Sequence, residues 1–249
     1  MSPRGLIGAA ILAASCLAGP AQASCRQALA IGMDVSGSVD TAEYRVQLDG
    51  LAAALTDPEV RQALVVPGMA PVRLLVFEWS GPNHQRVLLD WTEITGPDGP
   101  DRIANRLRAA TRVAAPPTTA VGDAMVFGAA ELRAQPDCWR RALDLSGDGR
   151  HNAGRHPRAV KHALQAGDPA LTVNGLVIGG SPASGTVDRD EGIAALSAYY
   201  HAWVTLGPGA FVETALGFED FQRAMTRKLL RELQSPALAG LSPREPGSR

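Results

Sequence analysis

The chain has 249 residues, of which 45% are hydrophobic and 20% are charged. This length and composition are typical of one large globular domain, and the sequence contains no internal repeat. The formal net charge of −1, without any basic run, excludes a protein whose main partner is nucleic acid.

The first 23 residues have the pattern of a secretory signal peptide. Arg4 precedes an apolar segment at 6–18, and Ala21 with Ala23 forms a cleavage signal for a cut after Ala23. The apolar segment is shorter than the ~20 residues that a membrane span needs, and no other segment in the sequence is suited to span a membrane. We therefore expect a periplasmic or secreted protein, with lipid attachment at Cys16 as the alternative.

The first predicted strand and helix lie on either side of a polar loop. Residues 26–33 predict a buried strand that ends at Asp34. Apolar residues at helical spacing predict a helix from Asp40, and Asp40 with Glu43 has the pattern of a capping box. Pro58 and the stretch after it are expected to end this helix.

Two further strands are predicted at residues 72–80 and 84–94. The turn between them is short, so the two strands are expected to form an antiparallel pair at the edge of the sheet. A helical stripe of apolar residues from Ile103 to Ala110 follows, and this helix is expected to stop before Pro116.

Helices and strands continue to alternate in the second half of the chain. The predicted order is helix 118–134, strand 140–149, helix 157–167, strand 171–180, helix 193–203, strand 210–215 and a helix from Phe218 to Leu233. This alternation predicts a doubly wound, mostly parallel α/β sheet with helices on both faces, as one domain over residues 24–234. The tail 235–249 is rich in proline, glycine and serine and is expected to be disordered.

Oxygen-bearing side chains follow the predicted strands at one edge of this sheet. Asp34, Ser36 and Ser38 alternate in the loop after the first strand, Thr119 opens the buried helix, and Asp148 ends the strand after it. Ligands of open α/β sheets bind at such strand ends. Carboxylates and hydroxyls are hard ligands that suit Mg²⁺ or Ca²⁺ and suit zinc poorly. The alternative is that Ser36 and Ser38 cap the first helix and that Asp34 is a turn residue.

Three stretches of the sequence resemble a known metal site. "DVSGS" at residues 34–38 matches the aspartate-x-serine-x-serine motif of the metal-ion-dependent adhesion site in von Willebrand factor type A (vWA) domains, while "TAVGDAM" and "SGDGRHN" resemble its threonine and aspartate loops. Pro117 stands where many members have glycine, which stiffens the approach to Thr119. "FEWSG", "DLSGDGRHN", "VNGLVIGG" and "GPGAFVETA" are similar to a bacterial family of exported vWA-type proteins of unknown function, over about residues 25–234.

The resemblance implies a six-stranded, Rossmann-like vWA fold with one antiparallel edge strand and a Mg²⁺ ion, or Mn²⁺ or Ca²⁺, at the top. It places Asp34, Ser36, Ser38, Thr119 and Asp148 around that ion, the hydroxyls directly and the aspartates partly through water. An open coordination position would accept an acidic group of a protein partner. The implied function is therefore adhesion-type binding by an exported, monomeric module, and not catalysis.

An enzyme is the competing interpretation. Asp34 at the end of a strand could act as the nucleophile of a Mg²⁺-dependent, phosphatase-like hydrolase. Such enzymes usually have a second aspartate two residues further on, where this chain has Ser36. The sequence also lacks the glycine-x-serine-x-glycine elbow of serine hydrolases, and "DLSGDG" has Arg155 where a calcium-binding EF-hand loop requires glutamate.

Cys25 and Cys138 are the two cysteines that remain after removal of the signal peptide. In the doubly wound order expected here, the first strand lies beside the strand that ends at Ser146. Cys25 precedes Asp34 by nine residues and Cys138 precedes Asp148 by ten. If the two aspartates meet at one metal, the two cysteines meet at the opposite edge, so we expect a disulfide bond in an oxidising compartment.

Overall fold

The computed structural model describes residues 25–180 and 186–234. The predicted signal peptide, with Cys16 and the cleavage site after Ala23, and the tail 235–249 lie outside the described residues. None of the described helices is long and apolar enough to cross a membrane.

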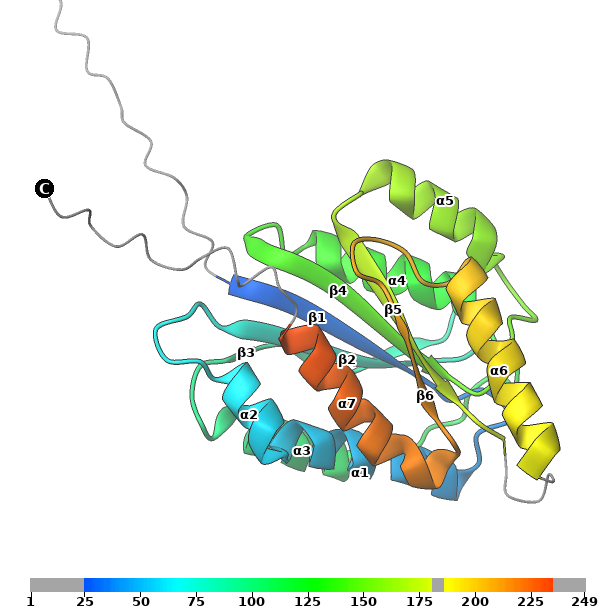
Figure 1. Cartoon of the computed structure of the whole chain (residues 1–249), viewed down its shortest axis with the longest axis horizontal. Coiled ribbons are helices and arrows are strands. Elements are labelled where there is room, and N and C mark those ends of the chain that lie inside the picture. The colour runs from blue at the N-terminus through cyan, green and yellow to red at the C-terminus, as the bar shows by residue number, and fades with distance from the viewer. Residues whose placement is uncertain (1–24, 181–185, 235–249) are drawn as a thin grey trace, which may run out of the picture.

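A six-stranded sheet forms the centre of the described structure (Figure 1). Its strands are β1 (Cys25–Asp34), β2 (Val72–Trp79), β3 (Gln85–Ile94), β4 (Cys138–Gly147), β5 (Leu171–Ile178) and β6 (Val212–Ala215). Their order in the sheet is β3-β2-β1-β4-β5-β6, with β2 and β3 antiparallel and the other neighbours parallel. The predicted fold class and the antiparallel edge pair are confirmed.

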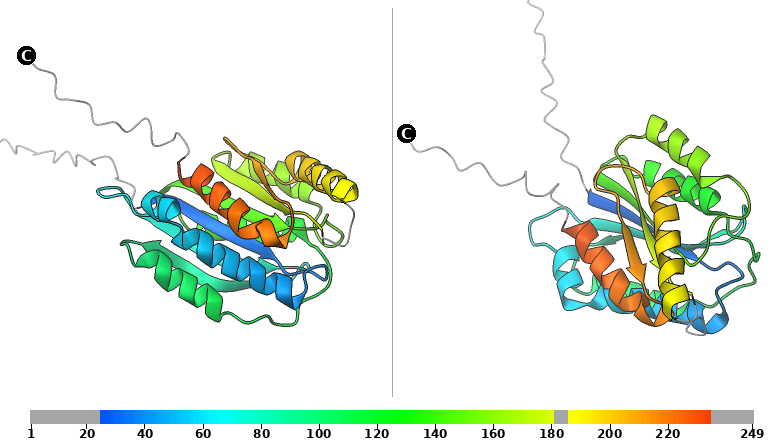
Figure 2. Two further views of the ribbon diagram at one scale, coloured as in Figure 1. Left: turned by 60° about the horizontal axis from the view of Figure 1, so that its bottom comes forward. Right: turned by 45° about the vertical axis from the view of Figure 1, so that its right-hand side comes forward.

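Helices cover both faces of the sheet (Figure 2). They are α1 (Thr41–Thr56), α2 (Pro58–Leu64), α3 (Gly99–Ala109), α4 (Val121–Arg133), α5 (Pro157–Gly167), α6 (Thr186–Trp203) and α7 (Phe221–Leu233). The first three and α7 bury one apolar cluster against the sheet, and α4, α5 and α6 bury a second cluster on the other face. The strand order reverses between β1 and β4, so this is the switch point of the sheet.

Several helix boundaries differ from the prediction; for example, α4 begins at Val121 and α7 at Phe221, each three residues after the predicted start. Asp40 caps α1 through the predicted capping box with Glu43. The stretch after it is a second helix, because the Asp57 side chain accepts hydrogen bonds from the next turn and Pro58 occupies the first helical position, where its missing N–H costs nothing. The first helix ends at Thr56, as expected, but the sequence analysis did not predict the short helix that begins at Pro58. Helix α6 begins at Thr186, seven residues before the predicted start at residue 193.

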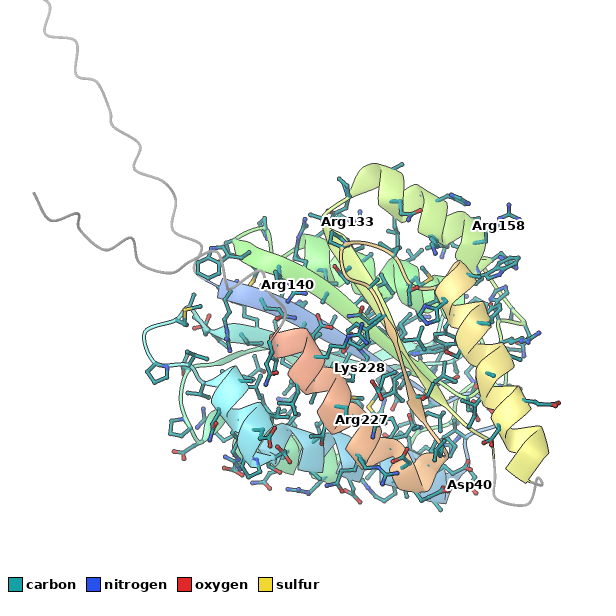
Figure 3. All side chains as sticks on the ribbon, viewed as in Figure 1. Asp40, Arg133, Arg140, Arg158, Arg227 and Lys228 are labelled. Carbon is teal, nitrogen blue, oxygen red and sulfur yellow. A yellow bond between two sulfur atoms is a disulfide. The ribbon has the colours of Figure 1, made fainter. Side chains whose placement is uncertain are left out.

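Buried polar side chains connect α7 to the sheet. Lys228 is fully buried and forms an ion pair with Asp144 of β4 (Figure 3). Glu232 accepts a hydrogen bond from Gln27 Nε2 at 3.0 Å and another from Asn174. Burial, together with the nearby Asp144, raises the pKa of Glu232 to about 7. Because buried charges are costly unless they are paired, this network specifies how α7 packs on the sheet.

The register between β1 and β4 places the two cysteines opposite one another. Cys25 pairs with Cys138 at the amino-terminal end of the strands, and Met33 pairs with Ser146 near the other end. The cysteine Cα atoms lie 4.4 Å apart and the sulfur atoms are joined. The predicted disulfide bond is confirmed.

We expect the mature protein to contain no free thiol when it is unfolded without reduction. The bond joins residues 113 positions apart, so the Cys25→Ser/Cys138→Ser variant should lose about 4 to 5 kcal/mol of unfolding free energy on the chain-entropy model. Thiol titration and urea unfolding measure the two effects. Detection of two thiols in protein made in an oxidising compartment would contradict the pairing.

Candidate metal site

Three loops meet at the carboxyl ends of β1 and β4. The first runs from Asp34 to Ser38, the second leads into α4 at Thr119, and the third follows β4 at Asp148. All three lie at the switch point, since β1 and β4 are neighbours there. The structure therefore brings together the five predicted residues, which are far apart in the sequence.

A continuous series of contacts joins four of the five side chains. Thr119 Oγ1 donates a hydrogen bond to Ser36 Oγ at 3.3 Å, and Ser36 Oγ lies 3.5 Å from Ser38 Oγ. Ser38 Oγ in turn donates to Asp148 Oδ1 at 2.7 Å. The fifth residue, Asp34, contacts the same loop because its Oδ1 accepts a hydrogen bond from the Ser36 backbone N–H at 2.8 Å.

The five residues differ in their access to solvent. Asp34, Ser36 and Thr119 have exposed fractions of 0%, 1% and 5%, so they form a buried floor. Ser38 is exposed and Asp148 is half-buried, so these two form the rim. A group held between floor and rim would keep one side open to solvent.

One carboxylate oxygen of this floor has no partner. Asp34 Oδ2 is buried and accepts no hydrogen bond from any described residue. An unpaired buried oxygen of this kind is costly. A divalent cation would compensate it, and the surrounding hydroxyl and carboxylate oxygens are the donors that Mg²⁺ and Ca²⁺ prefer. The residues present therefore fit a hard cation.

Hydrogen bonds that involve the backbone connect the three loops. Asn152 Oδ1 accepts a hydrogen bond from the Thr119 N–H at 2.8 Å, and the Asn152 N–H donates to the Thr119 carbonyl at 3.0 Å. The Gly37 N–H donates a hydrogen bond to the Pro117 carbonyl at 3.0 Å. The segment that leads to Thr119 therefore contacts the first loop. The sequence alone does not indicate this role of Asn152, although the residue lies in the stretch "SGDGRHN".

Tyr200 of α6 closes the underside of the site. Its side chain is fully buried, and its hydroxyl has no hydrogen-bond partner within the described part of the chain. A Cβ atom at Gly147 would lie 2.5 Å from this hydroxyl oxygen and 3.1 Å from Asp34 Oδ2. A side chain at position 147 would therefore collide with the Tyr200 hydroxyl, so glycine is needed there. The Tyr200 hydroxyl and Asp34 Oδ2, which are both unpaired, lie on the same side of Gly147. No local pattern in the sequence indicates this placement of Tyr200.

Burial and a neighbouring carboxylate change the electrostatics of the site. Burial, together with the Asp148 carboxylate, raises the pKa of Asp34 from 3.8 to about 7. Burial also raises the pKa of Asp148 and, with help from Asp34, raises the pKa of Tyr200 well above its usual value. Deprotonation of the Asp34 and Asp148 carboxyl groups is thus unfavourable in the metal-free protein. A bound cation would favour the charged form of both groups.

A second kind of metal site is not found. Within residues 25–180 and 186–234, no three His, Cys, Asp or Glu side chains gather in a way that could hold a metal ion. The candidate site differs from such clusters because three of its five side chains are hydroxyls.

A family model matches residues 24–237, and its description is "Protein of unknown function (DUF1194)". The chain belongs to this family. No curated protein sequence matches this DUF1194 chain.

Several solved structures have a similar fold. Proximal thread matrix protein 1 from the mussel byssus, in a structure with a zinc-occupied MIDAS motif, has a TM-score of 0.55 and 18% identity, over 84% of this chain and 48% of that one. A mutant of the PilB minor pilin from Streptococcus sanguinis has a TM-score of 0.59 and 12% identity, over 90% of this chain and 65% of the pilin. The pilus adhesin SpaC from Lactobacillus rhamnosus GG has a TM-score of 0.55 and 11% identity, over 84% of this chain and 31% of the adhesin.

The DUF1194 chain therefore spans less than two thirds of each of these three proteins. At such low identity the similarity establishes a shared fold. The zinc-occupied motif is a property of the mussel protein.

The raised pKa of Asp34 predicts a pH-dependent stability of the metal-free protein. Between about pH 4 and about pH 7 the unfolded chain holds the carboxylate, whereas the folded chain holds the protonated acid. Folding takes up a proton in this window, so the free energy of unfolding falls as pH rises, by about 4 kcal/mol from Asp34 alone. Urea unfolding in EDTA measures this slope.

The Asp34→Asn variant is the control for this prediction, because it cannot titrate. Its unfolding free energy should fall less steeply than that of the wild type between these pH values. Parallel curves for the two proteins would show that Asp34 titrates normally in the folded state.

Proposed function

We propose that this DUF1194 protein is an exported vWA-type module that binds a divalent cation, Mg²⁺ in the first place, through Asp34, Ser36, Ser38, Thr119 and Asp148. The bound ion would then recognise an acidic group of a protein partner. The observation that carries the proposal is the convergence of these five oxygen-bearing side chains around a buried carboxylate oxygen without a partner.

The donor set supports a hard cation. Three hydroxyls are neutral ligands, and the carboxylates of Asp34 and Asp148 would together balance the two positive charges of the ion. When bound, the cation supplies a Lewis-acidic position for an incoming carboxylate. The chain's own part is to orient the hydroxyls, to keep the floor dry and to leave the side of Ser38 and Asp148 open. Mn²⁺ or Ca²⁺ would be held by the same oxygens.

The similar folds support binding over catalysis. They include a thread matrix protein, a minor pilin and a pilus adhesin, all named for structural or adhesive roles. The hydrolase alternative requires Asp34 to attack a substrate, yet its carboxylate is fully buried beneath the hydroxyls. Ser36 stands where such enzymes have the second acid. Mg²⁺-dependent turnover of a phosphate ester, abolished by Asp34→Asn, would instead establish the hydrolase.

Calorimetric titration of the mature protein with Mg²⁺ tests the metal assignment. We expect one ion per chain and a loss of affinity of more than about 100-fold in the Asp34→Ala/Asp148→Ala variant, since even outer partners of a metal site contribute 10–100-fold. Asp49→Ala is the matched control, because Asp49 is an exposed carboxylate that pairs with Arg45 on α1. Unchanged affinity in the double variant would refute the assignment of these ligands.

Affinity capture from a periplasmic extract tests the partner. The wild-type protein and Asp49→Ala should retain the same protein in Mg²⁺ and release it in EDTA, whereas Asp34→Ala should retain none of it. Capture of the same proteins by the wild type and by both variants, in Mg²⁺ and in EDTA alike, would contradict recognition through the metal.

A further inference from the structure

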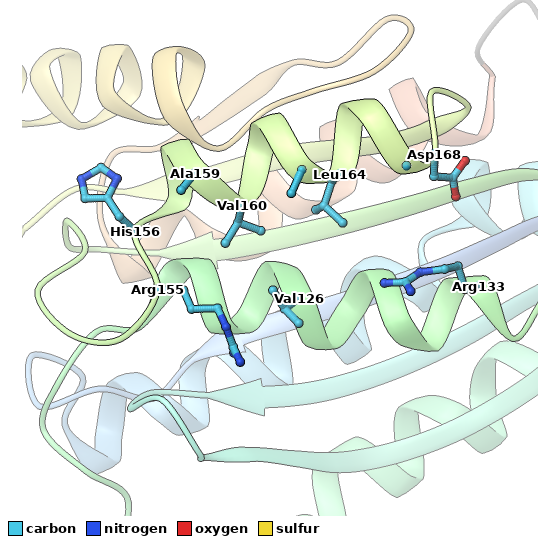
Figure 4. Close-up of a pocket in the computed structure, with 10 residues that line it drawn as sticks. Val126, Arg133, Arg155, His156, Ala159, Val160, Leu164 and Asp168 are labelled. Atoms are coloured by element: carbon cyan, nitrogen blue, oxygen red, sulfur yellow. The ribbon is translucent and has the colours of Figure 1, made fainter.

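A groove with a volume of about 620 Å³ runs between α4 and α5, on the face of the sheet that these helices cover (Figure 4). Val126 of α4 and Val160 and Leu164 of α5 line it with apolar side chains. Its volume lies within the range of small-molecule sites, and its lining has their mixture of many apolar groups and few polar ones. No residue of the candidate metal site lines this groove.

The groove exists because small residues lie where α5 faces α4. Ala159, Ala163 and Gly167 follow one another at helical spacing along α5 and leave the space between the helices unfilled. The lining extends from His156 to Gly167, which is about 16 Å at 1.5 Å per residue. This length and the apolar floor suit an extended hydrocarbon chain.

The ends of the groove differ in their free charge. Asp168 is paired with Arg141 at 3.0 Å, and Figure 4 shows its carboxylate directed away from the groove. At the other end, Arg155 is paired with Asp123. Among the described residues, the Arg133 side chain has no ion-pair or hydrogen-bond partner, and in Figure 4 its guanidinium reaches back along the groove between the two helices.

The one unpaired charge in the groove is therefore a cation. A guanidinium binds a carboxylate through two parallel hydrogen bonds. The carboxyl-terminal ends of α4 and α5 lie near Arg133 and oppose an anion there, but a charge-assisted hydrogen bond is stronger than the interaction with a helix end. The guanidinium also reaches away from those ends and toward the middle of the groove.

We propose that the groove between α4 and α5 binds a small amphipathic anion, a monocarboxylate with an unbranched apolar chain. Arg133 holds the carboxylate, and the chain lies on Val126, Val160 and Leu164 toward His156. This site is independent of the divalent cation, because it shares no residue with the candidate metal site.

Decanoate is the probe for this site, and the full mature protein is titrated with it below the micelle-forming concentration. Heteronuclear NMR should show saturable shifts at Val126, Val160 and Leu164, identical in Mg²⁺ and in EDTA. Decyltrimethylammonium, which has the same chain and the opposite charge, should bind at least about tenfold more weakly.

Two variants locate the contacts. Arg133→Gln should weaken decanoate binding about tenfold, and Ala163→Phe, which fills the groove from an exposed position, should abolish it. Arg158→Gln is the matched control. Arg158 is an exposed arginine at the opposite end of these helices and stacks on Trp203 (Figure 3), so this variant should bind decanoate within twofold of the wild type. Circular dichroism confirms that each variant is folded.

Three results would overturn the proposal. The first is the absence of saturable decanoate binding to the wild type at millimolar concentration. The second is equal binding of decanoate and decyltrimethylammonium, which would mean that the groove takes apolar chains without selecting an anion. The third is unchanged decanoate binding in folded Arg133→Gln or Ala163→Phe.

Discussion

The parallel pairing of β1 with β4 is the constraint on which the other features depend. One register sets Cys25 opposite Cys138 at one end of the two strands and brings the loops after Asp34 and Gly147 together at the other. The two ends are about 30 Å apart, at ~3.3 Å per residue. A slip by one residue would turn alternate side chains to the opposite face and separate the oxygens of the candidate site. The disulfide bond therefore stabilises the register without contacting the site.

The candidate site has an electrostatic cost that the rest of the fold offsets. Asp34 is fully buried, its second oxygen is unpaired and Asp148 is a nearby like charge, so the charged floor is unfavourable without a cation. Two apolar clusters, one on each face, and the ion pair of Lys228 with Asp144 stabilise the sheet that carries this site. A bound cation would offset the repulsion between the two carboxylates and the burial of Asp34. The same carboxylates would then contribute to the affinity for the cation.

The sequence was sufficient to predict the fold, the disulfide bond and the grouping of the five oxygen-bearing residues, because each depends on strand order and on distance along a strand. Features that depend on local turn chemistry were less accessible. Pro58 correctly predicts the end of the first helix, but the pattern does not show that Asp57 caps a second helix directly after it. Tertiary placements were not predictable at all. Tyr200 reaches the site from a helix that begins beyond β5, and the groove beside Arg133 arises only when α5 packs on α4.

Binding of one divalent cation where the three loops meet can be tested directly. Crystals of the mature protein grown with Mn²⁺ would locate the ion through its anomalous scattering. We expect one strong anomalous peak per chain, within direct coordination distance of the hydroxyl oxygens of Ser36 and Ser38 and next to Asp34. A peak at another position, or the absence of a peak at this edge of the sheet while the ion is present in saturating amounts, would contradict it.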